Sequence, residues 1–165
     1  MYSPKGLRTA IDFGLAEASA ALRDLDSAAE YYHKVVDAVP DHSKAVGALA
    51  QTEFLRHSRS RSNSNGSAVS RRILSLDSIE KLFLRALDCN PDDTQNLINF
   101  AQFMKTARNN LEGAKGLLYK ATLLQPCNGG ILGNYAAVLS KSGDLKRAEV
   151  CCQHPVSHVF AVVLI

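Results

Sequence analysis

The chain has 165 residues, 46% of them hydrophobic, which is enough to bury the core of one globular domain and excludes a fully disordered protein. The formal net charge is only +3, and no stretch reaches the roughly 18 apolar residues that a membrane-spanning helix requires. No N-terminal segment has the pattern of a secretory signal peptide, so we expect a soluble protein of the cytoplasm, with the nucleus as the alternative.

The composition favours helices, and three prolines mark a repeating pattern. Ala and Leu supply most of the apolar residues, and the chain has no Trp and only five Pro. Pro40, Pro91 and Pro126 each follow an amphipathic stretch, with a small or branched residue twelve positions before and an alanine ten positions after. This spacing predicts helical hairpins that repeat along the chain.

The first predicted hairpin pairs Ala16 with Ala28, after an N-terminal extension of residues 1–8. Asp24 lies four residues before Ala28 and can accept a hydrogen bond from the free N–H groups at the start of the second helix. Pro40 ends that helix, because its ring has no N–H and biases the preceding residue away from helical geometry. The two alanines allow two antiparallel helices to approach closely.

The second hairpin pairs Ala50 with Ile79, which are 29 residues apart instead of 12. The difference predicts an insert of 17 residues at about residues 57–74, before a helix capped by Ser75. The insert reads HSRSRSNSNGSAVSRRIL, which is too rich in Ser, Arg, Asn and Gly to bury a core. We therefore expect a disordered loop.

A solvated linker is the simplest interpretation of this insert, and a regulatory loop is the alternative. Arg59, Arg61 and Arg72 each precede a serine by three residues, a pattern that resembles the sites of basic-directed kinases. Phosphate would lower the local positive charge and fold the loop onto its own arginines. Attraction of nucleic-acid phosphates is a third interpretation, but the insert has no aromatic platform for bases. The candidate phosphorylation sites are Ser60, Ser62, Ser64 and Ser75.

Two further hairpins follow the insert. The third hairpin pairs Ala101 with Ala114, and Asn110 is the expected N-cap of its second helix. The fourth pairs Ala136 with Ala148, with Asp144 as the expected N-cap. The third hairpin has one extra residue in its turn. Pro155 follows Ala148 closely, so the last helix should end early. Residues 155–165 form an apolar tail outside the repeats, and its end, residues 159–165, is a candidate self-association site.

The recurring unit resembles the tetratricopeptide repeat, a helix-turn-helix of about 34 residues with small residues at its eighth and twentieth positions and a proline near its end. The clearest copies read GLAEASAALRDLDSAAEYYHKVVDAVP, NFAQFMKTARNNLEGAKGLLYKATLLQP and NYAAVLSKSGDLKRAEV. The resemblance covers about residues 9–154 as four repeats, although the usual Trp and Gly of the first helix are missing. It implies an all-α fold, an α-solenoid of antiparallel helix hairpins.

The sequence contains no catalytic or metal-binding pattern. His154 and His158 follow a cysteine pair, but no second pair of ligands follows with the spacing of a zinc site. His33, His42 and His57 have no partnered Cys or acid at motif spacing. We therefore expect no enzymatic activity, no cofactor and no metal site.

The chain has four cysteines, Cys89, Cys127, Cys151 and Cys152. The last two are adjacent, so a helix would direct them to different faces, and the sequence gives no sign of a secretory context. We expect reduced thiols.

The resemblance also implies a concave groove, lined by the first helix of each hairpin, that accepts an extended segment or a helix of another protein. Helical phase predicts a mostly neutral, amide-rich lining. Asn99 and Asn134 occupy equivalent places, similar to the asparagine ladders of some tetratricopeptide superhelices, with ordinary surface asparagines as the alternative. The predicted groove residues are Phe13, Glu17, Gln51, Gln95, Asn99, Gln102 and Asn134. Gly47 is also expected in the lining of the second hairpin.

Members of this family that bind chaperones use a Lys, Arg and Asn clamp for a C-terminal carboxylate. The matching places here are Gly47, Gln51, Asn99, Gly130 and Asn134. Only Asn99 fits the clamp, so we expect weak or absent binding of chaperone tails.

The sequence thus predicts a scaffold for protein–protein interaction whose partner is not specified. An RNA-associated helical-repeat protein is the alternative, suggested by the 35-residue spacing of the third unit and the arginine-rich insert. Nucleic acid is the less favoured partner, because the groove is neutral and the helix crossings hold alanines. A third interpretation is a fragment or isoform whose further repeats contain the site.

Overall fold

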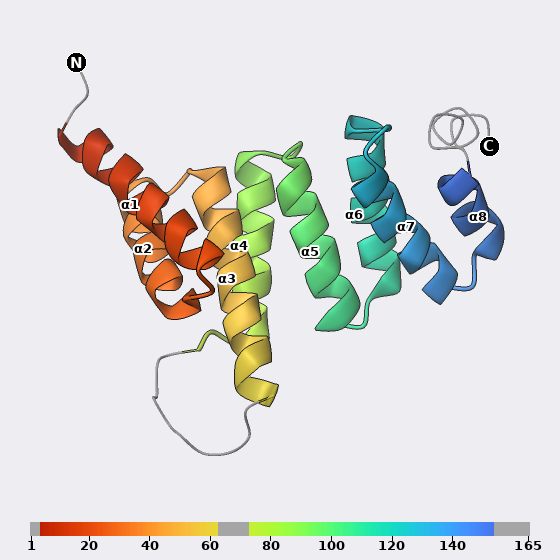
Figure 1. Cartoon of the computed structure of the whole chain (residues 1–165), viewed down its shortest axis with the longest axis horizontal. Helices are drawn as coiled ribbons and strands as arrows, with labels where there is room; N and C mark the ends of the chain where they lie inside the picture. Colours follow the sequence, from red (N-terminus) through yellow and green to blue (C-terminus); the bar gives the residue numbers. More distant parts are fainter. Residues whose placement is uncertain (1–3, 63–72, 154–165) are drawn as a thin grey trace. The chain divides into compact units, whose positions relative to one another are not determined.

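The computed structural model describes residues 4–62 and 73–153, and over these ranges all regular secondary structure is α-helix (Figure 1). The chain divides into two compact units, Met1–Pro91 and Asp92–Ile165. The first unit contains α1 (Pro4–Ala21), α2 (Leu25–Ala38), α3 (Ser43–Ser62) and α4 (Leu76–Cys89). The second contains α5 (Thr94–Thr106), α6 (Leu111–Leu124), α7 (Gly129–Lys141) and α8 (Leu145–Gln153).

The predicted small-residue pairs lie where the helices of each hairpin pack together. In the first unit α1 packs on α2, α2 on α3 and α3 on α4; the second unit repeats this order from α5 to α8. All eight residues are buried: Ala16, Ala28, Ala50, Ile79, Ala101, Ala114, Ala136 and Ala148. Small side chains at these places allow the backbones to approach, and the larger apolar residues around them form the core of each unit.

The four predicted N-cap residues are confirmed. Each side chain accepts a hydrogen bond from the backbone N–H three residues later: Asp24 from Ser27, Ser75 from Ser78, Asn110 from Gly113 and Asp144 from Arg147. N-cap residues are also found at three helices that come first in their hairpins, α3, α5 and α7. Asp93 and Asn128 begin α5 and α7, and His42 accepts from the N–H of Ala45 through Nδ1 at 3.2 Å to begin α3.

The prolines end the second helices as predicted. Helices α2, α4 and α6 each end two residues before a proline. The intervening residues have left helical geometry, with ψ of 87° at Val39, 93° at Asn90 and 74° at Gln125. This is the restriction that a proline places on the residue before it.

Three of the turns within hairpins contain a left-handed residue directly before the N-cap. These residues are Arg23 (φ 62°), Asn109 (φ 52°) and Gly143 (φ 86°). The N–H of Asp24 donates to the carbonyl of Ser19 at 3.0 Å, whereas that of Asn110 donates to Met104, one residue further back, at 2.9 Å. The third hairpin therefore accommodates its extra residue within the turn.

Helix boundaries differ from the sequence prediction at two places. Helix α1 begins at Pro4, inside the extension expected over residues 1–8, because proline is well suited to the first turn of a helix. Helix α3 continues to Ser62, inside the insert expected to be disordered over 57–74. There the Ser58 hydroxyl donates to the carbonyl of Phe54 at 2.9 Å, and Arg59 in the last turn complements the helix dipole.

Helix α8 is described as far as Gln153, where the described residues end, so the early stop expected from Pro155 stays a prediction. The rest of the insert (63–72) and the apolar tail (155–165) lie outside the described residues, so their predicted behaviour stays a prediction. Nowhere in the described part of the chain is a helix long and apolar enough to cross a membrane.

Candidate functional site: the first-helix surfaces and a polar cleft

In the second unit, two of the predicted groove residues lie around one shallow pocket. Gln102 comes from α5 and Asn134 from α7, the first helices of neighbouring hairpins. The full lining is Ile98, Ala101, Gln102, Lys105, Leu118, Asn134 and Val138. The pocket thus combines side-chain amides, which can bond to a peptide backbone, with apolar side chains, which can contact apolar groups of a ligand.

Lys105 is a pocket residue that the sequence prediction missed. It adds a cation to a surface expected to be neutral. Lys105 lies three residues after Gln102 and four after Ala101, so all three share one face of α5. Helical phase, extended by one more turn, was the signal that could have identified it.

Gln95 and Asn99, two other predicted groove residues, bond to each other. The Gln95 side-chain amide donates to the Oδ1 of Asn99 at 3.0 Å along α5. This bond orients the Asn99 carboxamide within its own helix. Asn99 does not line the pocket of Gln102 and Asn134, so the pair expected from the asparagine ladder is not brought together there.

In the first unit, three of the residues assigned to the groove, Phe13, Gly47 and Gln51, are less exposed than helical phase suggested. The ring of Phe13 packs edge-on against Tyr32, with centroids 6.0 Å apart, and lies 5.1 Å from the ring of His42. Gly47 is buried, so it does not line a groove. Gln51 is half-buried, and its Oε1 atom has no hydrogen-bond partner among the described residues.

Glu17 is exposed on α1 and affects the buried Tyr32. The pKa of Tyr32 is raised above its usual value of 10.0, mainly because burial disfavours the phenolate and secondarily because Glu17 adds a nearby negative charge. The phenol stays protonated to a higher pH than in water.

A second feature of the first unit is an open cleft between α2 and α3, with charged side chains in its lining and a volume of about 520 Å³. Its lining residues are Asp26, Ala29, Glu30, His33, Glu53, Arg56 and Leu74. We call it the α2–α3 cleft. None of the predicted groove residues lines it.

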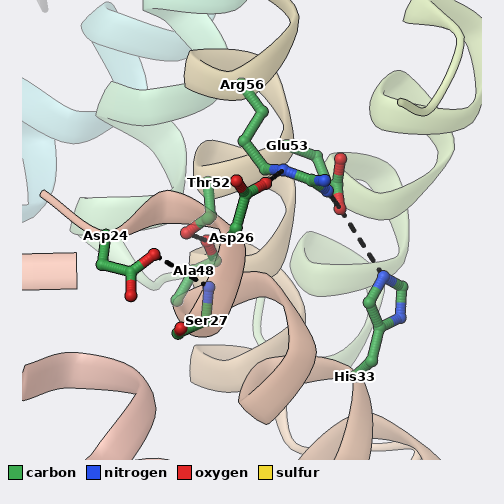
Figure 2. A network of polar contacts seen from close by, with 8 residues as sticks. All are labelled: Asp24, Asp26, Ser27, His33, Ala48, Thr52, Glu53 and Arg56. Atoms are coloured by element: carbon green, nitrogen blue, oxygen red, sulfur yellow. Dashed lines mark hydrogen bonds and ion pairs between the residues drawn. The ribbon is translucent and has the colours of Figure 1, made fainter. Parts of the chain in front are cut away.

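The polar side chains of the α2–α3 cleft form a network (Figure 2). Arg56 donates from Nε to Asp26 at 3.0 Å and from Nη1 to Glu53 at 2.7 Å. The Glu53 side chain is only 1% exposed, and His33 Nε2 lies 3.6 Å from its Oε1 atom. His33 thus has an acidic neighbour on another helix, which sequence spacing could not indicate because the two residues lie at no motif spacing.

The candidate phosphorylation sites have different surroundings. Ser75 is the N-cap of α4, and its hydroxyl lies 3.0 Å from that of Ser78. Ser60 is helical and donates to the carbonyl of His57 at 3.1 Å, and Ser62 is the last residue of α3. Ser64 lies outside the described residues.

Over residues 4–62 and 73–153, no three His, Cys, Asp or Glu side chains are arranged to hold a metal ion. Cys89 and Cys127 are free and exposed.

The structure resembles solved proteins at low sequence identity. The O-GlcNAc transferase of Thermobaculum terrenum matches 84% of this chain with 16% identity and a TM-score of 0.66. This chain spans only 23% of that transferase. MamA from Desulfovibrio magneticus RS-1 matches 93% of this chain and 76% of its own, with 14% identity and a TM-score of 0.69. In a further MamA structure the match covers 95% of this chain and 81% of that MamA chain, with 10% identity and a TM-score of 0.71.

No protein-family model and no curated protein matches the sequence. The helix order, the buried alanines and the structural matches show the fold, an all-α, tetratricopeptide-like stack of antiparallel helix hairpins.

Proposed function

We propose that the chain is a protein–protein interaction scaffold that holds a peptide or helix of another protein against the first helices of its hairpins. The observation that carries this proposal is the pocket that Gln102 and Asn134 both line. A carboxamide both donates and accepts hydrogen bonds, so amides on neighbouring helices match the N–H and C=O groups of a peptide backbone.

The pocket lining also suggests the partner's side chains. Ile98, Leu118 and Val138 give the pocket an apolar part, and because its volume is only about 10 Å³, an apolar residue of the partner would lie across its opening rather than enter it. Lys105 at the same pocket favours an acidic residue next to it. A partner segment with this pair of residues would use both kinds of contact.

Capture of partners by the tagged full chain, followed by mass spectrometry, tests this proposal. We expect the partner to be lost with the Gln102→Ala/Asn134→Ala variant. It should be retained with Glu112→Ala/Lys115→Ala, which removes an ion pair on α6 away from the pocket. Equal recovery with both variants would exclude the pocket as the binding site. Loss of the partner after ribonuclease treatment would favour the RNA-associated alternative instead.

We also propose that chaperone tails bind weakly or not at all. A terminal carboxylate is held by several converging cations in the clamp that the family resemblance implies, and here Lys105 is the one cation that lines the described pocket of the second unit. Micromolar binding of a chaperone tail peptide in calorimetry would contradict this.

Absence of catalytic activity, a cytoplasmic location and phosphorylation of the serines at the insert are further parts of the proposal. Incubation with a basic-directed kinase followed by peptide mapping tests the last. Ser60 and Ser75 are both exposed, and Ser75 lies at a helix start, where a phosphate is favoured by the helix dipole.

A further inference from the structure

The α2–α3 cleft carries more negative than positive charge. Asp26, Glu30 and Glu53 contribute three carboxylates, and among the described lining residues Arg56 contributes the one guanidinium. Lys34 bonds to Glu30 at 2.9 Å and offsets one of the three carboxylates, and Arg56 offsets another, so one net negative charge remains at the cleft. A cationic ligand would therefore enter a favourable field.

Glu53 supplies a second, independent observation. Its side chain is 1% exposed, and Oε1 accepts the hydrogen bond from Arg56 at 2.7 Å. The other carboxylate oxygen, Oε2, is buried and has no hydrogen-bond partner among the described residues. A buried charged acceptor without a donor is costly, and because Glu53 and His33 both line the cleft, a ligand that displaces the His33 ring could supply the missing donor.

The size and chemistry of the cleft favour a side chain over a metal ion. The volume of about 520 Å³ is far larger than one ion needs, and the described residues contain no metal-type cluster there. Ala29 and Leu74 give the cleft an apolar part beside its carboxylates. An arginine side chain has an apolar stem and a planar head with five N–H donors, which matches both parts.

We propose that the α2–α3 cleft binds the arginine side chain of a partner protein, with its guanidinium donating to Glu53 and Glu30. The His33 ring can move when a ligand binds, because it is 48% exposed and is not held by a hydrogen bond to Glu53. Its Nε2 atom lies 3.6 Å from Glu53 Oε1, which is too long for such a bond. An incoming guanidinium can displace this ring or stack on it. The site does not depend on the groove proposal, since the two surfaces share no residue.

Amide chemical-shift titration of the full chain with the peptide acetyl-Ala-Arg-Ala-amide tests the proposal. We expect saturable shifts at Glu30, His33 and Glu53. The same peptide with citrulline, which has the shape of arginine without its charge, should bind at least tenfold more weakly. Equal binding of the citrulline peptide, or shifts confined to other residues, would overturn the proposal. Equal binding of a lysine peptide would overturn the assignment to arginine.

Two variants locate the site. Glu53→Gln should weaken binding at least tenfold, and Glu30→Gln, which changes an exposed carboxylate, should weaken it about threefold without affecting the fold. Glu112→Gln on α6 is the matched control and should bind as the original chain does. If Glu53→Gln fails to fold, an unchanged affinity in Glu30→Gln still contradicts the proposal.

The chain's own arginines are possible competitors by sequence, because Arg71 and Arg72 directly precede the segment that contains Leu74. The titration is therefore repeated with Arg71→Gln/Arg72→Gln. Binding by either protein supports the proposal if it is lost with Glu53→Gln, and absence of binding by both overturns it.

Discussion

Arg56 on α3 reaches back to Asp26 on α2, with 3.0 Å between Nε and Oδ1, while the same guanidinium bonds to Glu53 on its own helix. The Arg56 side chain is 11% exposed and that of Glu53 is 1% exposed. One cation thus joins two helices and compensates a buried acid, as Figure 2 shows.

Replacement of Arg56 by Ala should therefore destabilise the first unit. It leaves the Glu53 carboxylate buried without its hydrogen bond, and breaking a buried pair in this way costs about 3 kcal/mol. Urea unfolding followed by circular dichroism measures the change. The double variant Arg56→Met/Glu53→Gln removes both charges and should recover most of the stability. A loss below about 0.5 kcal/mol in the single variant would show that water compensates Glu53.

Ala114→Leu should destabilise the second unit. Ala114 is fully buried where α5 and α6 pack, so a larger side chain forces the helices apart at a cost of about 1–3 kcal/mol. Ala137→Leu, at an exposed position of α7, is the matched control and should change stability little. Thermal unfolding compares the two, and equal midpoints would contradict close packing at Ala114.

Arg23→Gly should stabilise the chain. Arg23 has a φ of 62°, a conformation that costs a side-chain-bearing residue about 1 kcal/mol and glycine almost nothing. Gly143 occupies the equivalent turn with a φ of 86°, and Gly143→Ala should destabilise by a similar amount. Denaturant midpoints should shift in opposite directions, and a shift in the same direction would contradict the turn geometry.

Stability should fall in alkali as Tyr32 ionises. Its pKa is raised by burial and by Glu17, so the folded chain binds the phenol proton more tightly than the unfolded chain does. The contribution is complete below the unfolded value of 10.0 and is lost as the pH rises through the higher folded pKa. Melting from about pH 9 to about pH 11 measures this loss, and Tyr32→Phe should reduce it. An identical pH profile for the variant would assign the loss to other groups.

Ser75→Ala should destabilise α4 by about 1 kcal/mol, because the N–H of Ser78 loses its cap. Ser75→Asp should retain the stability, since aspartate caps well and its charge favours a helix N-terminus. Chemical unfolding of both variants provides the comparison. Similar losses in both would show that the cap contributes little.

Most of the fold could be predicted from the sequence because its determinants are local. Asp24 and Asn110 cap helices that begin at the next residue, and Pro40 ends a helix two residues earlier. Ala16 and Ala28 meet because a short turn joins their helices. Each of these signals acts within about a dozen residues, a range over which spacing is informative.

The candidate sites were less predictable because they depend on how helices are set against each other. Arg56 and Asp26 are separated by 30 residues, and their contact requires the register of α3 on α2. The burial of Gly47 depends on the same register. Lys105, in contrast, lies on a face already assigned to α5, so its position could have been predicted from helical phase.

In the first unit, the main packing joins helices that are consecutive in the chain. Each contact closes only a local loop, so we expect fast folding and fraying from the terminal hairpin. More residues of the sequence separate α3 from α4 than separate the other consecutive helices of the unit, and doubling the length of a connecting segment costs in general only about 0.6 kcal/mol in closure entropy. The α3–α4 junction is therefore where evolution can lengthen or shorten this chain while leaving the neighbouring helices almost unaffected.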